Sequence, residues 1–201
     1  MGSQAATKQH IWQSFSTLIR TTPFDKITVE MIIRESKVSK STFYRHFRDK
    51  YDVLNYNSME IAEQLINRKV CHDWKEFLDN MFLAIQQNLS YFQRAFRSSG
   101  QNSHSGFLFS YSFSIVEGCY LRYTGTASLS IHDRYVIGHY CHGCVGILQD
   151  WLNEPESLTP KQMADIFYEA MPDYLRDSWG GHLYAGLPEK QLGEHLYAEL
   201  P

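Results

Sequence analysis

The sequence lacks the features that mark a membrane protein or a disulfide-rich secreted protein. It contains no run of 18 apolar residues, which is about the length needed to cross a bilayer, and no signal-peptide pattern. Four cysteines among 201 residues are too few for a disulfide scaffold and are expected to be reduced. We therefore expect a soluble, cytoplasmic protein with no membrane partner.

Common active-site signatures are also absent from the sequence. There is no phosphate-binding glycine loop, no nucleophile elbow and no HExxH motif. The pairs of cysteine and histidine that do occur are weak indicators of catalysis on their own. We therefore predict a protein that is not an enzyme and that has no cofactor.

Charge is distributed unevenly along the chain, although the formal net charge is only −3. Residues 1–70 hold 11 Lys or Arg and 7 Asp or Glu, a net charge of +4, whereas residues 71–201 hold 8 and 15, a net charge of −7. A basic amino-terminal part joined to an acidic body suggests that one end of the protein meets a polyanion and the other does not.

Residues 28–50 predict two short helices joined by a tight turn, with a third helix after them. Side chains that can accept hydrogen bonds from the free amides of a helix start stand at three positions: Thr28, Ser39 and Asp49. After the second of these, Phe43 and Phe47 are four residues apart and must share the buried face of their helix.

The opposite face of that second helix is polar and basic. A rotation of about 100° per residue turns Ser41 and Arg45 nearly opposite the two rings, with Thr42, Tyr44 and Arg48 beside them. Residues 34–50 hold six Lys or Arg against two acids. Such a face, starting at a helix amino terminus one short turn after another helix, is what reading of the major groove of DNA requires. The alternative is a helical interaction protein whose basic face meets only solvent.

Residues 27–54, ITVEMIIRESKVSKSTFYRHFRDKYDVL, resemble the DNA-binding core of the TetR family of transcriptional regulators. The resemblance is close over residues 8–68, and the order V-S-K-x-T-F-Y-R-H-F is a specific signal. It implies a duplex DNA operator as the partner. The implied contacts to bases or to the groove come from Lys40, Ser41, Thr42, Tyr44 and Arg45, and those to phosphates come from Thr28, His46 and Lys50.

The sequence departs from the family pattern at two positions. Lys37 stands where the turn usually has glycine, at a position expected to need a left-handed backbone, so lysine should cost about 1 kcal/mol there. Ser41 replaces a frequent glycine at a position that faces the bases. Both departures leave the motif intact and the operator sequence open.

The remainder of the chain also reads as helices. The predicted helical ranges are 7–21, 50–66, 74–97, 107–123, 131–152 and 160–171, with a polar loop over 98–106. Only 107–123 is ambiguous, because Phe109 to Ile115 alternates like a strand. The same stretch also has helical spacing, and an isolated strand without a partner is unstable, so we predict a helix.

These elements predict an all-α fold, with an amino-terminal three-helix helix-turn-helix module and a carboxy-terminal helical bundle that dimerises. The predicted domains are residues 1–52 for DNA binding, 53–178 for effector binding and dimerisation, and 179–201 as a tail. In the tail HLYAGLP recurs as HLYAELP. A flexible tail, a short extra helix and a repeated partner-binding motif all stay open.

The two last predicted helices resemble the pair through which TetR-like subunits dimerise as a four-helix bundle. A homodimer is also expected because a single recognition helix contacts too few bases for specificity, whereas two copies on a palindrome contact enough. The predicted interface residues are Cys144, Val145, Leu148, Trp151, Leu152, Ile166 and Phe167.

A set of aromatic residues is the candidate lining of an effector pocket. An apolar cavity among them would bind a small-molecule effector, although an aromatic stripe also suits a packed core. The residues are Phe92, Phe96, Tyr111, Phe113, Tyr120 and Tyr123. The sequence does not identify the effector, nor does it separate a repressor from an activator, because that depends on where the operator lies.

One segment of the sequence combines residue types that bind zinc: His139, Cys141, His142 and Cys144. On one helix the two histidines lie about 60° apart, and the cysteines face largely the other way. One ion therefore cannot take all four, and no metal site is predicted. A metal-responsive regulator that completes its site with other residues remains an alternative.

Overall fold

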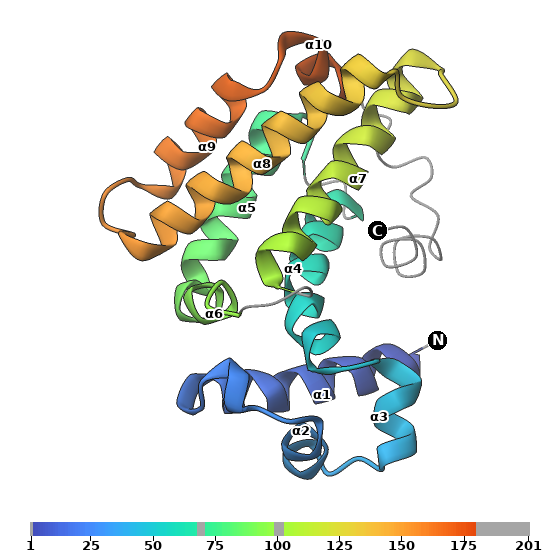
Figure 1. The fold of residues 1–201 in the computed structure, drawn as a ribbon, viewed down its shortest axis with the longest axis vertical. Helices are drawn as coiled ribbons and strands as arrows, with labels where there is room; N and C mark the ends of the chain where they lie inside the picture. The colour runs from blue at the N-terminus through green and yellow to red at the C-terminus, as the bar shows by residue number, and fades with distance from the viewer. Residues whose placement is uncertain (1, 68–70, 99–102, 180–201) are drawn as a thin grey trace. The chain divides into compact units, whose positions relative to one another are not determined.

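The computed structural model describes residues 2–67, 71–98 and 103–179. Within these ranges every regular element is a helix (Figure 1), so the all-α prediction is confirmed, including the helix predicted over 107–123. None of the helices described is both long enough and apolar enough to span a lipid bilayer. The repeated HLYAxLP segments at 182–188 and 195–201 lie outside the described residues.

Contacts between residues divide the chain into two compact units. Unit 1 lies within residues 1–60 and 88–107, and unit 2 lies within residues 61–87 and 108–201. The described residues 88–98 and 103–107 therefore pack with the amino-terminal helices, although parts of unit 2 precede and follow them in the sequence. The predicted boundaries of the domains at residues 52 and 178 stay predictions.

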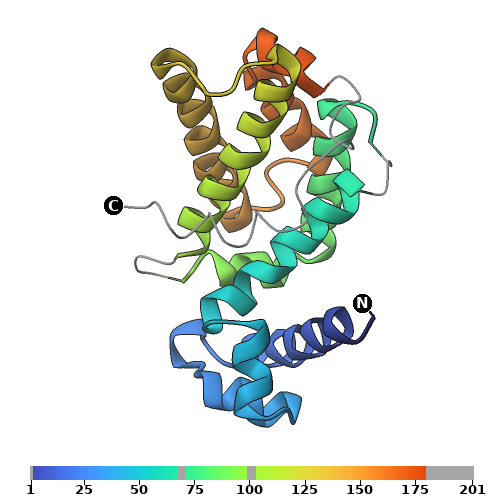
Figure 2. The same ribbon diagram turned by 90° about the vertical axis from the view of Figure 1, so that its right-hand side faces the viewer.

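Unit 1 contains the helix-turn-helix. Its elements in chain order are α1 (Gly2–Thr21), η1 (Phe24–Lys26), α2 (Val29–Ser36), α3 (Lys40–His46), the first part of α4 (Lys50–Asn67), α6 (Leu89–Ala95) and the start of α7 (His104–Thr124). Helix α1 packs against both α2 and α3 (Figures 1 and 2). Ile11, Phe15 and Ile19 recur along one face of α1 and are fully buried, so α1 supplies the core on which the two short helices rest.

The three predicted helix caps are confirmed. Thr28 Oγ1 accepts a hydrogen bond from the Met31 amide at 3.3 Å, and Ser39 Oγ accepts one from the Thr42 amide at 3.0 Å. Asp49 Oδ1 accepts from the amide of Tyr51 at 2.8 Å. Because each cap satisfies a donor that a helix start leaves free, these side chains fix where α2, α3 and α4 begin.

Lys37 ends α2 in the left-handed conformation, with φ 53° and ψ 28°, as its place in the turn predicts. This conformation brings the Cβ of an L-residue too close to backbone oxygen. We expect Lys37→Gly to raise the free energy of unfolding by about 1 kcal/mol, because glycine adopts this region without the clash. Chemical denaturation without DNA measures the change, and an unchanged or lower stability would contradict it.

The prediction of one continuous helix over 74–97 is wrong. Helix α5 (Trp74–Gln87) ends before Asn88, whose φ of −116° and ψ of 26° are not helical, and α6 starts after it. The polar loop predicted over 98–106 is also too long, because α7 begins at His104. Ser103 Oγ accepts from the Gly106 amide at 3.3 Å, so a serine cap starts α7 three residues before that glycine.

Unit 2 is a helical bundle. It contains the end of α4, then α5, most of α7, α8 (Ile131–Asn153), α9 (Pro160–Ala170), α10 (Asp173–Arg176) and η2 (Asp177–Trp179). The predicted capping box is confirmed, since Thr159 Oγ1 accepts from the Gln162 amide at 3.3 Å and Gln162 Oε1 accepts from the Thr159 amide at 2.9 Å. Phe82 of α5 packs edge-on against Trp151 of α8 and Phe167 of α9 and so joins three helices in one core.

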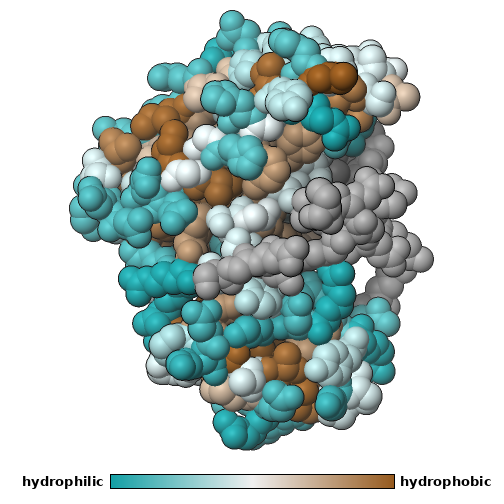
Figure 3. Space-filling model, in the orientation of Figure 1, coloured by the Kyte–Doolittle hydropathy of each residue, from teal (hydrophilic) through white to brown (hydrophobic). Residues whose placement is uncertain are grey.

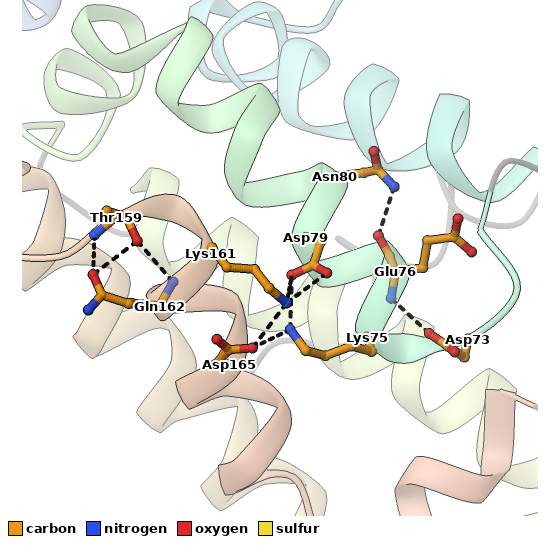
Figure 4. A network of polar contacts seen from close by, with 9 residues as sticks. All are labelled: Asp73, Lys75, Glu76, Asp79, Asn80, Thr159, Lys161, Gln162 and Asp165. Carbon is orange, nitrogen blue, oxygen red and sulfur yellow. Dashed lines mark hydrogen bonds and ion pairs between the residues drawn. The ribbon is translucent and has the colours of Figure 1, made fainter.

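An alternating network of charges connects α5 to α9 (Figure 4). Lys75 Nζ lies 2.9 Å from Asp79 and 2.5 Å from Asp165, and Lys161 Nζ lies 3.1 Å from Asp79 and 3.2 Å from Asp165. All four side chains keep contact with solvent, so each pair adds little stability by itself. Each of the two carboxylates pairs with one lysine of α5 and one lysine of α9, and the network therefore fixes the register of α9 along α5.

Candidate nucleic-acid interface

Helix α3 separates its apolar side chains from its polar ones as the sequence predicts. Phe43 and Phe47 are 0% and 3% exposed, and their ring centroids lie 6.1 Å apart. Ser41 and Arg45 are exposed, and Tyr44 is 48% exposed. The structure thus brings the predicted groove-reading residues to the outer side of a helix whose inner side is anchored in the core of unit 1.

Lys40 and Thr42 complete this outer face. Lys40 is exposed, and its Nζ lies 6.0 Å from the centroid of the Tyr44 ring, within the range of a cation–π contact. Thr42 is half-buried and faces the hydroxyl of Ser39. No acidic residue lies within α3, so the face that these residues form carries only positive or neutral groups.

Thr28 and His46, two of the predicted phosphate contacts, lie at helix ends. Thr28 is exposed at the amino terminus of α2, where the helix dipole favours an anion. Burial of the ring, together with the nearby charges of Arg45 and Lys8, lowers the pKa of His46. The lowered pKa favours the neutral ring near pH 7, and the predicted phosphate contact of His46 stays a prediction.

Lys50, the third predicted phosphate contact, points into unit 1. Its Nζ donates to the carbonyl oxygens of Phe24 and Ile27, both at 3.0 Å, and lies 4.5 Å from the centroid of the Phe24 ring. Phe24 is the first residue of η1, and Ile27 is its C-cap, next to Thr28. Lys50 thus holds η1 and the residue before Thr28 in place, a role that the sequence did not indicate.

We expect Lys50→Met to lower the free energy of unfolding of unit 1 by about 2 kcal/mol, because hydrogen bonds from a charged group to part-buried carbonyls are among the stronger ones. Lys40→Met is the matched control, since it removes the same charge from an exposed position and should change stability by less than about 0.5 kcal/mol. Urea unfolding followed by circular dichroism measures both. Equal stabilities of the two variants would contradict the role given to Lys50.

The six predicted effector-pocket residues are distributed over both units. Phe92 is buried in unit 1, where its ring and that of Phe96 lie 6.2 Å and 5.4 Å from the ring of His104. The other four lie in unit 2, where Tyr111 is buried, Phe113 and Tyr120 are half-buried and Tyr123 is 49% exposed. Their joint role in effector binding stays a prediction.

The predicted dimer residues lie mostly inside unit 2. Leu148, Trp151, Leu152 and Phe167 are buried in its core, and Cys144, Val145 and Ile166 are half-buried. The outer face of α8 carries other apolar residues instead: Ile131 is 80%, Tyr135 75% and Ile147 41% exposed. At about 100° per residue Tyr135 lies about 40° and Ile147 about 160° around the helix from Ile131, so the three residues are spread over the outer half of α8. Sequence reasoning missed them because the more apolar buried residues dominated the pattern.

The cysteine and histidine segment of α8 is divided between two sides of the helix. Cys141 is buried and Cys144 half-buried, and burial raises the pKa of both thiols, that of Cys144 to about 12. His139 and His142 are exposed, and the ring of His142 stacks on Phe109. Among the described residues no three or more His, Cys, Asp or Glu side chains are grouped to hold a metal ion.

A capped short helix with a buried aromatic side and an outer side of hydroxyl, tyrosine and basic residues defines a helix-turn-helix DNA-binding protein. Residues 16–56 match the family model described as bacterial regulatory proteins, tetR family. Residues 72–173, half of the chain, match the model described as transcriptional regulator C-terminal region. The chain belongs to the TetR family of DNA-binding transcriptional regulators.

A solved structure with a similar fold is that of the dihydroxyacetone kinase operon activator DhaS. The two proteins are 14% identical, with a TM-score of 0.57, and the match covers 81% of this chain and 92% of that one. At this identity the likeness shows the shared fold alone. No curated protein sequence matches the chain.

Proposed function

We propose that the protein binds a palindromic duplex operator as a homodimer, with α3 of each copy in the major groove, and that a small-molecule effector controls this binding. The observation that carries the proposal is the outer face of α3. Its basic and hydroxyl groups are exposed, while the aromatic rings on the opposite side of the helix are buried and anchor it in the core. Lys40, Ser41, Thr42, Tyr44 and Arg45 contact bases or the groove, and Thr28 and His46 contact phosphates. Lys50 supports α2, and regulation rather than catalysis is the activity.

The two halves of the operator provide the test. We expect a duplex with one scrambled half-site to bind at least about 100-fold more weakly than the intact palindrome, since each wrong base pair costs about 1–3 kcal/mol. Fluorescence anisotropy at a fixed salt concentration measures both affinities. Equal affinity for the two duplexes would exclude simultaneous reading by two recognition helices.

The outer face of α8 supports the proposed dimer. Ile131, Tyr135 and Ile147 are the exposed apolar residues of this helix, and Figure 3 shows apolar side chains among hydrophilic ones over the surface formed by α8 and α9. Gly143 and Gly146 lie on the same face, and a Cβ added at either meets no atom within 4 Å. A second helix can therefore approach α8 closely at these two glycines and cover part of its exposed apolar surface.

We expect Gly143→Arg to convert the dimer to a monomer, because the long side chain occupies the space that the second helix needs. Within one chain the substitution is harmless, as arginine favours helix formation over glycine and the position is open. Sedimentation velocity with circular dichroism measures assembly and helix content together. Thr126→Arg, in the exposed loop after α7, is the control, and a dimeric Gly143→Arg variant would contradict this interface.

The proposed effector site is in unit 2. Arg122 Nε, Tyr174 Oη and Trp179 Nε1 are buried there and have no hydrogen-bond partner among the residues that the structure describes. Buried polar groups in native proteins are normally satisfied. Tyr120, one of the predicted pocket residues, lies 5.5 Å from Tyr174 between ring centroids. A bound molecule with a hydrogen-bond acceptor beside Tyr120 would satisfy the hydroxyl of Tyr174, and thermal-shift screening followed by operator competition tests for one.

A further inference from the structure

The hydroxyl groups at the start of α3 form a connected cluster. Ser39 Oγ accepts the amide proton of Thr42 at 3.0 Å and donates its own proton to Thr42 Oγ1 at 2.8 Å. Ser41 Oγ lies 2.9 Å from the same Ser39 oxygen. Ser39 is therefore the centre of the cluster and contacts both hydroxyl groups that follow it.

Counting protons fixes which hydroxyl donates in each contact. A serine hydroxyl has one proton to donate and two lone pairs to accept with. Because the proton of Ser39 is directed to Thr42, the contact between Ser41 and Ser39 needs the proton of Ser41. Ser41 can therefore only accept a hydrogen bond from a partner outside the cluster. Thr42 keeps its own proton and can still donate one.

We propose that Ser41 determines specificity by accepting a hydrogen bond from a base amino group in the major groove. The inference rests on the proposed function, since it assumes that α3 enters the groove. Ser41 is exposed in the first turn of α3, the part of a recognition helix that contacts base edges. The amino groups available there are N6 of adenine and N4 of cytosine, where guanine and thymine present carbonyl oxygens.

The neighbours of Ser41 strengthen the assignment. Lys40 carries an ammonium group that can only donate, and Thr42 retains a proton to donate. Donors of this kind suit guanine, thymine or phosphate oxygen. Ser41 therefore supplies the hydrogen-bond acceptor in the first turn of α3. At the base that Ser41 faces, adenine and cytosine should be bound more tightly than guanine and thymine.

The test begins with the operator bound by the wild-type protein. Each position of the half-site is replaced by all four bases, and affinity is measured for the wild type and for Ser41→Ala. We expect one position at which adenine and cytosine are favoured over guanine and thymine by about fivefold per half-site, the effect of one neutral hydrogen bond, and we expect Ser41→Ala to remove this preference.

A base analogue isolates the amino group. Purine deoxyriboside, which lacks N6, replaces adenine at that position. It should weaken wild-type binding by about fivefold per half-site and leave Ser41→Ala unaffected. Such coupling identifies the pair directly, because each change matters only while the other partner is present.

A second variant tests the orientation of the proton. Thr42→Val keeps the shape of the side chain but removes the acceptor for the Ser39 proton, so Ser41 is free to donate outward. The preference at the coupled position should then weaken although Ser41 is still present. Base preferences that stay unchanged in Ser41→Ala, or that follow another division of the bases, overturn the inference while DNA binding stands. A wild-type protein that binds no duplex overturns both proposals.

Discussion

Replacing Arg45 by alanine is expected to lower operator affinity by at least about 30-fold without changing the fold. A bidentate arginine contact to a base is worth about 1–3 kcal/mol, and a dimer on a palindrome loses the contact twice. Arg45 is exposed on α3, on the side of the helix opposite to the buried Phe43. Its removal therefore leaves the core of unit 1 intact.

Anisotropy titration of the operator, together with thermal unfolding, separates binding from stability in this variant. Arg20→Ala is the control, because it removes the same charge from an exposed position at the end of α1. We expect Arg20→Ala to lower affinity by no more than about threefold, the effect of one weak electrostatic contribution. If the two variants lost affinity equally, α3 would contribute only net charge and would not read bases.

Replacing Phe43 by alanine is expected to lower the free energy of unfolding by about 3–5 kcal/mol, the usual cost of removing a buried aromatic ring. The side chain is 0% exposed and lies 6.1 Å from Phe47 between ring centroids. Phe43 is the one buried residue of α3, with Thr42 and His46 half-buried, so α3 loses its main attachment to the core. Denaturant unfolding, with hydrogen exchange to localise the loss, measures this effect.

Tyr44→Ala is the matched control for Phe43→Ala. The Tyr44 side chain is 48% exposed, so its removal should change stability by less than about 1 kcal/mol while it weakens DNA binding. The Phe43→Ala and Tyr44→Ala variants thus distinguish the stabilising role of the inner face of α3 from the DNA-binding role of its outer face. Similar stability losses in both variants would mean that the helix does not pack as described.

The parts of the fold that the sequence predicted are those determined by local chemistry. Thr28, Ser39 and Asp49 are caps because their side chains bond amides two or three residues ahead, a relation that sequence spacing reveals. The left-handed turn at Lys37 was predicted from the family resemblance instead, because the family usually has glycine at this position. Spacing alone also placed Ser41 and Arg45 opposite the buried rings.

The parts that could not be predicted depend on contacts between residues far apart in the sequence. His104 Nδ1 lies 2.8 Å from Asn55 Oδ1, 49 residues earlier, and the hydroxyl of Tyr91 donates to the carbonyl of Leu54. Burial lowers the pKa of His104 to about 3, so the ring is neutral and suited to its interior position. These bonds hold Tyr91 and His104 in unit 1, and no periodicity in the sequence around them indicates the contacts.

Selection of bound duplexes from a random pool at low ionic strength tests most directly whether α3 reads DNA. We predict that the wild-type protein enriches a sequence with two-fold symmetry and that Arg45→Ala enriches none. Failure of the wild-type protein to enrich any sequence, with or without candidate effectors, would contradict the function proposed for this face.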